Sequence, residues 1–278
     1  MKEIYDKLSY QISKSITRAY STSFTLGIRL LDPKLRGPIY AIYGFVRLAD
    51  EIVDSFHDFN KVELLEKFTA DTWEAIEKGI SLNPVLNSFQ QVVNEYQIDH
   101  QLISTFLRSM EMDLDKKQYN QKLYEQYILG SAEVVGLMCL KVFVYGDEKK
   151  YDELKYSAMK LGSAFQKINF LRDIQADYKN MGRSYFPDIN YEYFNETAKS
   201  SIENDIEKDF RDGYEGIRKL PAKSRIGVYL AYVYYYQLFK KIKKTHARHI
   251  MEERIRINNA RKYVILFSSY LRHTMNML

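Results

Sequence analysis

The chain has 278 residues, of which 46% are hydrophobic and 28% charged, and its formal net charge is +5 at pH 7. Because no Ser/Gly-rich linker, low-complexity tract or repeat of domain size divides it, we expect one all-α domain over residues 1–278. Its only cysteine, Cys139, excludes an internal disulfide, and the charges scattered through residues 1–14 exclude a secretory signal peptide. The longest uncharged apolar run, residues 226–239, is shorter than the roughly 20 residues that cross a bilayer, so we expect a soluble, cytoplasmic protein.

The first predicted helix covers residues 3–19 and ends before the polar turn YSTSF at residues 20–24. From the residues alone, Ser21 and Ser23 are interpreted as capping or turn residues, because hydroxyl groups accept hydrogen bonds from free backbone amides. Pro33 and Pro38 then mark the start of a longer helix.

Residues 40–56, YAIYGFVRLADEIVDSF, form the first of two acidic helices. Asp50 and Asp54 are four residues apart and therefore lie on one face, roughly 6 Å from each other. Tyr43 and Arg47 continue this polar line, and the positions beside it are apolar. A mostly apolar helix belongs inside a protein, where a carboxylate is costly unless it is paired or binds metal. Arg47 therefore has two interpretations that are compatible with each other: it neutralises Asp50, or it holds a diphosphate through bidentate hydrogen bonds.

The next predicted helices cover residues 61–79, residues 84–96 after an Asn83 cap, and a segment from Asp99 through residue 117. In the last of these, Asp113 is considered for the metal site and left out of the expected ligand set.

A further helix is predicted over residues 124–145. Small residues interrupt its bulky ones, namely Gly130, Ser131, Ala132 and Gly136. They serve either tight helix packing or the close approach of a long ligand.

The second acidic helix, GSAFQKINFLRDIQADY at residues 162–178, repeats the pattern of the first. Asp173 and Asp177 are again four residues apart, and Gln166 and Asn169 extend their face. The following segment, residues 179–190, is predicted to be a loop that closes over the site and excludes water.

Two carboxylate pairs without Cys or His at ligand spacing make an oxygen-only site, which favours Mg²⁺ or Mn²⁺ over zinc or copper. Magnesium usually completes its coordination with substrate phosphates. The hypothesis is that the two acidic helices face each other across a cavity and hold Mg²⁺ ions that bind a diphosphate. The alternatives are solvated helix faces and buried Asp–Arg ion pairs.

The last third of the chain begins with a charged helix at residues 201–220, followed by a tyrosine-rich helix from residue 226. Tyrosine rings attract cations, although most of these tyrosines also fit an amphipathic core. Residues 240–262 then carry nine Lys and Arg against Glu252 and Glu253. This segment is a solvated face, an anionic-membrane contact or a diphosphate-facing rim. Nucleic-acid binding is not expected, because no recognition motif accompanies the charge.

The two acidic blocks, YSTSF, and the sequence GRSYFP at residues 182–187 resemble the squalene/phytoene synthases, which join two prenyl diphosphates head to head. The resemblance covers nearly the whole chain. It implies an all-α bundle of the isoprenoid synthase type with a central cavity, and a magnesium-dependent prenyltransferase.

The resemblance also implies roles for individual residues. The implied metal ligands are Asp50, Asp54, Asp173, Asp177 and Asn169. The implied catalytic residues are Tyr127, Arg47 and the same four aspartates. The implied substrate-binding residues are Ser21, Ser23, Tyr43, Arg47, Gln166, Asn169, Arg172, Arg183 and Tyr234; for Arg183 a solvent-facing position is the alternative. The chain departs from the family pattern at Glu133, where the family has a small residue, and at Ala176, where it commonly has glutamate.

Within the family, the single predicted domain, the lack of a predicted membrane span and the departure at Glu133 favour a bacterial-type phytoene synthase. Such an enzyme joins two C20 diphosphates through a cyclopropylcarbinyl diphosphate, without NADPH. The alternative is a squalene or dehydrosqualene synthase acting on C15 substrates. Two other classes fit less well. A di-iron bundle needs Glu-x-x-His motifs, and the chain offers only Asp54-x-x-His57. A non-catalytic helical adaptor at a membrane explains the basic segment but not the two acid pairs. The oligomeric state is not predicted.

Overall fold

The computed structural model describes residues 1–115, 118–187, 189, 191–258, 262, 264, 265 and 269. Within these residues the regular structure is helical, with an isolated bridge between Gln118 and Ser184 and no β-strand. The predicted all-α fold class is confirmed. The predicted loop at residues 179–190 and the basic segment at residues 240–262 lie partly outside the described residues.

The helices follow one another closely along the chain. The first six are α1 (Lys2–Tyr20), α2 (Thr22–Leu30), α3 (Pro33–Asp54), α4 (Lys61–Lys78), α5 (Pro84–Tyr96) and α6 (His100–Met112). A continuous stretch is then formed by α7 (Gln121–Ile128), the π-helix η1 (Leu129–Glu133) and α8 (Val134–Phe143). The remaining elements are α9 (Glu148–Met181), the 3₁₀ turn η2 (Tyr191–Tyr193), α10 (Glu196–Lys219), α11 (Ala222–Lys243) and α12 (Ala247–Ile250).

Side-chain caps fix several helix starts. Ser21 accepts a hydrogen bond from the amide of Phe24 at the start of α2, which confirms its interpretation as a capping residue. Asp32 and Asp147 cap α3 and α9 in the same way. Helix α6 is shorter than predicted, because the amide of Asp113 turns back to the carbonyls of Met110 and Glu111 and closes the helix.

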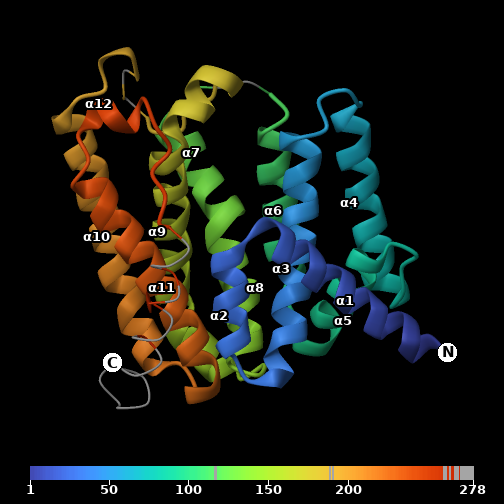
Figure 1. Ribbon diagram of the computed structural model, residues 1–278. Helices are drawn as coiled ribbons and strands as arrows, with labels where there is room; N and C mark the ends of the chain where they lie inside the picture. Colours follow the sequence, from blue (N-terminus) through green and yellow to red (C-terminus); the bar gives the residue numbers. More distant parts are fainter. Residues whose placement is uncertain are drawn as a thin grey trace.

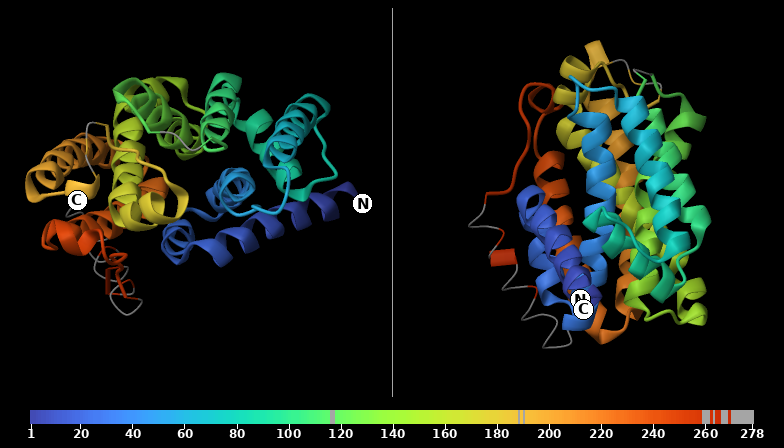
Figure 2. Two further views of the ribbon diagram at one scale, coloured as in Figure 1. Left: turned by 90° about the horizontal axis from the view of Figure 1, so that it is seen from above. Right: turned by 90° about the vertical axis from the view of Figure 1, so that its right-hand side faces the viewer.

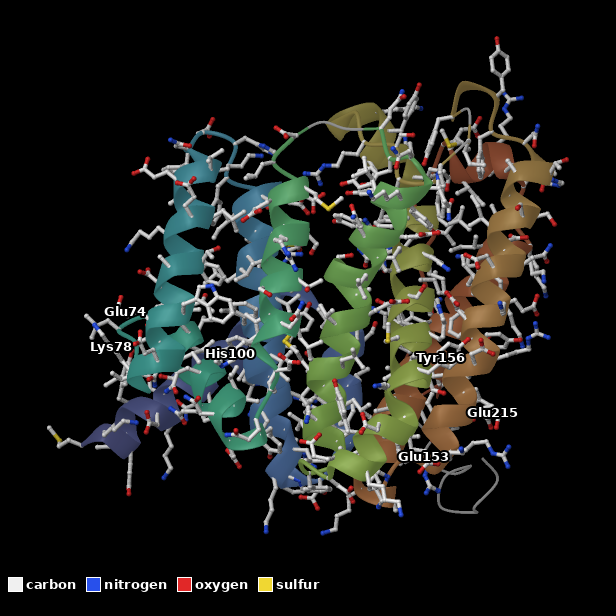
Figure 3. All side chains as sticks on the ribbon, turned by 180° about the vertical axis from the view of Figure 1, so that it is seen from behind. Glu74, Lys78, His100, Glu153, Tyr156 and Glu215 are labelled. Carbon is white, nitrogen blue, oxygen red and sulfur yellow. The ribbon has the colours of Figure 1, made fainter. Side chains whose placement is uncertain are left out.

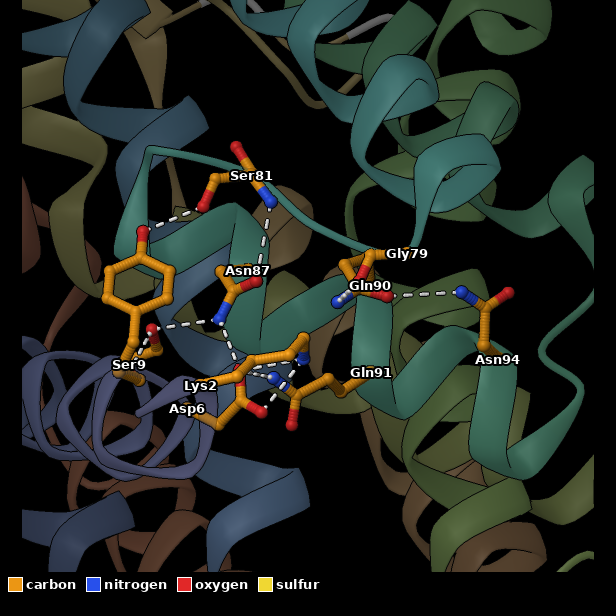
Figure 4. A network of polar contacts seen from close by, with 10 residues as sticks. Lys2, Asp6, Ser9, Gly79, Ser81, Asn87, Gln90, Gln91 and Asn94 are labelled. Atoms are coloured by element: carbon orange, nitrogen blue, oxygen red, sulfur yellow. Dashed lines mark hydrogen bonds and ion pairs between the residues drawn. The ribbon is translucent and has the colours of Figure 1, made fainter.

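The long helices α3, α9, α10 and α11 run along one bundle axis, while α1 crosses the outside of the bundle (Figures 1 and 2). A polar network fastens α1 to α5 (Figure 4). In it, Asn87 donates to Asp6 at 3.1 Å and to Ser9 at 3.0 Å, and Gln91 donates to Asp6 at 2.8 Å. The outer faces carry charged residues such as Glu74 and Lys78 on α4 (Figure 3).

The buried apolar residues form two main clusters on either side of the bundle. One is built around stacked aromatic rings of α3 and α5, with Phe45 and Phe89 centroids 3.8 Å apart. The other joins α9, α10 and α11 around Ile168, Phe210 and Leu238. A cavity of about 300 Å³ lies between the two clusters, and its walls take residues from both.

The stretch Gln121–Phe143 has the length and mean hydropathy, 1.3, of a membrane span. In the bundle, 56% of that window is buried. A core helix passes the same test of length and composition, so this stretch is weak evidence for a membrane span.

Candidate active site

The first acidic pair lies at the C-terminal end of α3. The Arg47 guanidinium bonds to Asp50 and to Glu51 on its own helix and stacks 4.2 Å over the ring of Tyr20. Burial raises the pKa of Asp50 to about 6, and the neighbouring charge of Asp54 adds to this shift despite Arg47. Arg47 therefore neutralises Asp50 in this structure, as one of its two predicted interpretations requires.

The second acidic pair lies near the C-terminal end of α9. Asp173 receives hydrogen bonds from Arg172 at 2.9 and 2.5 Å, and Arg254 of the C-terminal segment lies 2.6 Å from the same carboxylate. The side chain of Asp177 has no hydrogen bond or ion pair within the described residues. Burial, followed by the charge of Asp173, raises the pKa of Asp177 to about 7.

Arg183 joins the two acidic helices. Its guanidinium donates to Asp54 at 2.8 Å, while its backbone amide donates to the carbonyl of Asp177 at 2.9 Å. The residue is 7% exposed, so the solvent-facing alternative for Arg183 is wrong. The ends of the two acidic helices therefore converge on one buried arginine, as the hypothesis of facing helices requires.

Asp113 is a member of this cluster that the expected site omitted. Tyr127 donates to its carboxylate at 2.5 Å, and Arg183 donates to its backbone carbonyl at 2.7 Å. Burial raises the pKa of Asp113 to about 7, and its Oδ1 has no hydrogen-bond partner among the described residues. The signal for it in the sequence is the one used for the acid pairs, a carboxylate beside buried apolar positions of a helix.

The cavity has a largely apolar lining and no aspartate or arginine of this cluster in its wall. Tyr43, Gln166 and Asn169 line its polar part, where Asn169 donates to Gln166 and accepts from Tyr235, both at 3.4 Å. Leu154 and Leu220 line a more distant part of the wall. The predicted cavity is therefore present, and three of the predicted substrate-binding residues line it.

The other predicted site residues do not line this cavity. They are the substrate-binding residues Ser21, Ser23, Arg47, Arg172, Arg183 and Tyr234, the catalytic Tyr127, and the four aspartates. The tyrosine of α11 that does so is Tyr235, on the same helical row as Gly227 and Ala231, whereas Tyr234 lies beside it with its ring perpendicular at 5.5 Å. Tyr127 instead packs into an aromatic cluster with Tyr119, Tyr185 and Phe170. Ser21 and Ser23 are half-buried at the start of α2, outside the lining.

The arrangement of the aspartates determines how they could hold divalent ions. Within the described part of the chain, no group of three or more His, Cys, Asp or Glu side chains is arranged to hold a metal together. Magnesium, however, usually binds one or two carboxylates and takes its other ligands from water and substrate phosphates. The oxygen-only pairs fit such a site, as does Asp177 without an ion pair in the described part of the chain, because a cation there would offset the cost of partly burying these carboxylates.

Comparisons with known proteins agree with this geometry. The profile of the squalene/phytoene synthase family matches residues 17–205. The chain is 28% identical to a phytoene synthase of Arthrospira platensis over 265 residues, covering 85% of this chain and 84% of the relative. It is also 28% identical to a 4,4'-diapophytoene synthase of Staphylococcus haemolyticus over 203 residues, covering 71% and 68%.

Solved structures show the same fold. The crystal structure of a dehydrosqualene synthase superposes with a TM-score of 0.83 at 23% identity and covers 97% of this chain and 98% of that one. The squalene synthase HpnC of Alicyclobacillus acidocaldarius superposes with a TM-score of 0.75 at 17% identity, covering 90% and 97%. The predicted isoprenoid synthase type of bundle is thereby confirmed. The chain belongs to the squalene/phytoene synthase family and is a prenyltransferase that joins prenyl diphosphates head to head.

Proposed function

We propose that the protein condenses two geranylgeranyl diphosphates to phytoene. The observation that carries this choice is the length of the cavity wall along α9. Asn169 and Leu154 both line the cavity and are 15 residues apart (169 − 154) on one helix, which corresponds to about 22 Å. With carbon–carbon bonds of about 1.5 Å, an extended C20 prenyl chain is roughly 19 Å long and a C15 chain roughly 14 Å. The C20 chain can therefore contact more of this wall than the C15 chain.

The chain's own residues carry out the binding steps. Arg47, Arg172 and Arg183 present guanidinium groups at the polar end, where they are suited to hold diphosphate oxygens. A divalent cation bound at the aspartate pairs would supply further neutralisation of the charge that develops on the departing diphosphate. The apolar wall keeps water from the allylic cation, and the rings of Phe165 and Tyr235, stacked 4.1 Å apart, offer it π-electron density.

The proposed reaction has two stages. In the first, a diphosphate leaves one substrate, its C1 forms two bonds to the double bond of the second substrate, and C1 loses a proton, which gives a cyclopropylcarbinyl diphosphate. In the second, the remaining diphosphate leaves, the cation rearranges, and loss of a second proton gives phytoene. Two diphosphates and two protons are released and no reductant is consumed, so NADPH is not required.

A second candidate is the same condensation with two C15 diphosphates. It is supported by the similarity to the 4,4'-diapophytoene synthase and by the superposition on a dehydrosqualene synthase. The two candidates differ in the occupancy of the distant end of the cavity, near Leu154 and Leu220.

The test is diphosphate release and product analysis with C15 and C20 substrates, with and without Mg²⁺ and NADPH. We expect Mg²⁺-dependent release with a C40 product and no effect of NADPH. Asp50→Asn and Asp173→Asn should each abolish release, whereas Asp58→Asn, at an exposed position just after α3, should leave it unchanged. Failure of the unmodified protein to release diphosphate from either substrate would overturn the proposal.

The basic segment at residues 240–262 bears on the entrance of the site and on the location of the protein in the cell. Arg254 contacts Asp173, which supports the interpretation of this segment as a rim of the diphosphate site. We also propose a cytoplasmic location, with membrane contact limited to the surface. Sedimentation with vesicles of anionic and of neutral lipid tests this, and equal binding to both would contradict an electrostatic contact.

A further inference from the structure

The helix that forms one wall of the cavity contains a π-turn at residues 129–133. The amide of Val134 bonds to the carbonyl of Leu129 with the wide i to i+5 spacing, and the Ser131 hydroxyl donates to the carbonyl of Tyr127 at 2.7 Å. Ser131 and Ala132 line the cavity. Such single π-turns occur mostly inside α-helices and frequently at functional sites.

Helix α9 touches this turn directly. A Cβ atom on Gly162 would lie 2.6 Å from the carbonyl oxygen of Ala132, so only glycine permits this approach. On the other side of the same stretch, a Cβ atom on Gly130 would lie 2.6 Å from the side chain of Ser109 on α6. The π-turn is therefore held between two helices, and a small shift of its backbone changes the cavity width at Ala132.

Glu133 ends the π-turn but does not line the cavity. It is 9% exposed, and its carboxylate lies 3.6 Å from the Lys160 ammonium of α9. Lys160 is 3.9 Å from Asp209 of α10. Tyr156, one turn before Lys160, lies where α9 meets α10 (Figure 3) and donates to Asp212 of α10 at 2.9 Å.

Asp209 continues this buried network. Ser163 and Lys167 of α9 both donate to its carboxylate at 2.6 Å. A charge network of this kind links η1, α9 and α10 behind the cavity wall. Removing one partner of a buried pair leaves the other without compensation, so the network resists displacement of the π-turn.

We propose that Glu133 is a positioning residue for substrate discrimination: through Lys160 it holds the π-turn against Gly162 and so fixes the width of the cavity at Ser131 and Ala132. The inference rests on the proposed prenyl condensation and names what selects the chain length. Gly162 is seven residues from Asn169 (169 − 162), about 10 Å below the polar end. A narrow section here keeps the prenyl chain extended, so an additional isoprene unit reaches the distant wall. A wider cavity at this point lets the prenyl chain fold back, so that the C15 and C20 substrates bind with similar affinity.

The test compares binding of unreactive thiolo analogues of the C15 and C20 diphosphates by calorimetry, with the kcat/KM ratio for the two substrates as a second measurement. Two variants remove the contact from opposite sides, Glu133→Gln and the partly exposed Lys160→Gln. In both variants we expect the ratio of the Kd for the C15 analogue to the Kd for the C20 analogue to change by about tenfold, in the direction of equal binding. The control is Glu203→Gln, since Glu203 forms a more deeply buried pair with Lys199 at 2.5 Å within α10, and neither residue lines the cavity.

The control variant should lose thermal stability but keep the ratio of the unmodified protein. The inference is overturned if both test variants keep that ratio within twofold, if Glu203→Gln changes it equally, or if the unmodified protein binds both analogues alike. Failure of the proposed function is seen separately, as absence of diphosphate release by the unmodified protein. If Glu133→Gln does not fold, Lys160→Gln gives the decisive ratio.

Discussion

The two acidic helices share one spacing of aspartates but are neutralised differently. In α3 both carboxylates have an arginine, Arg47 for Asp50 and Arg183 for Asp54. In α9 two arginines, Arg172 and Arg254, share Asp173. Asp177 has no such partner in the described part of the chain, and burial raises its pKa to about 7.

This difference shows where added positive charge stabilises the protein most. In α3 an incoming cation competes with guanidinium groups that already occupy the carboxylates. In α9 it meets the half-buried carboxylate of Asp177, whose ionised form is penalised, so the gain in free energy is larger there. The same spacing of aspartates in the sequence therefore gives two halves of one site that differ in how far their carboxylates are neutralised.

The largest effect is expected for Arg183→Ala, which removes the link between the two halves. It leaves Asp54 without its partner and Asp113 without the nearest cation, and breaking a buried pair costs about 3–5 kcal/mol of unfolding free energy. Diphosphate release should fall by about 10²-fold or more, the scale for loss of a preorganised donor. Urea unfolding and steady-state kinetics measure both.

Arg183→Lys is the control, because it keeps the charge and loses the planar fork. It should recover part of the stability and less of the activity. Equal stability of Arg183→Ala and the unmodified protein would show that the two acidic helices do not depend on this residue.

The next largest effect is expected for the pH dependence of stability at Asp113, which lies beside Arg183. Its pKa is raised from 3.8 to about 7, so the folded state binds its proton more tightly than the unfolded state. The free energy of unfolding should therefore fall as pH rises from about 4 to about 7, and this contribution should be level outside that window. Asp113→Asn, which keeps an acceptor oxygen for Tyr127, should reduce this slope. Unfolding midpoints measured from pH 4 to pH 8 test it, and an unchanged slope in the variant contradicts the assignment.

A smaller effect is expected for Arg254→Ala, at the rim of the second half. Its side chain is 48% exposed, and ion pairs of this kind contribute within about 1 kcal/mol to stability. The substrate KM should rise by up to about tenfold, and added salt should reduce the difference from the unmodified protein because exposed charges are screened. A variant with unchanged KM at low salt would place Arg254 outside the site.

The smallest effect distinguishes the neighbouring tyrosines of α11. Tyr235→Phe loses the 3.4 Å hydrogen bond to Asn169, and a neutral bond of this length contributes about 1 kcal/mol or less. We expect a loss of kcat/KM of up to about fivefold, and no change for Tyr234→Phe. The reverse order would support the predicted substrate-binding role of Tyr234 over that of Tyr235.

Much of the fold was predictable because helical periodicity is a local property. The apolar positions around Asp50 and Asp173 predicted buried helices, and Ser21 was correctly interpreted as a cap. The end of α6 was misplaced because its last turn is closed by Asp113, whose partners Tyr127 and Arg183 lie far along the chain. The position of Tyr235 in the cavity wall was not predicted, because adjacent helix positions differ by a rotation that only the neighbouring helices fix.

From the sequence it follows that two mostly apolar helices each carry a pair of aspartates on one face, and that the chemistry of these pairs is that of oxygen ligands. Spacing and residue type decide these properties within a single turn of helix. Three pairings depend on the tertiary structure, namely Arg183 with Asp54, Arg254 with Asp173, and Glu133 with Lys160 behind the cavity wall. These pairings join segments more than 25 residues apart in the sequence, so they exist only once packing brings the helices together.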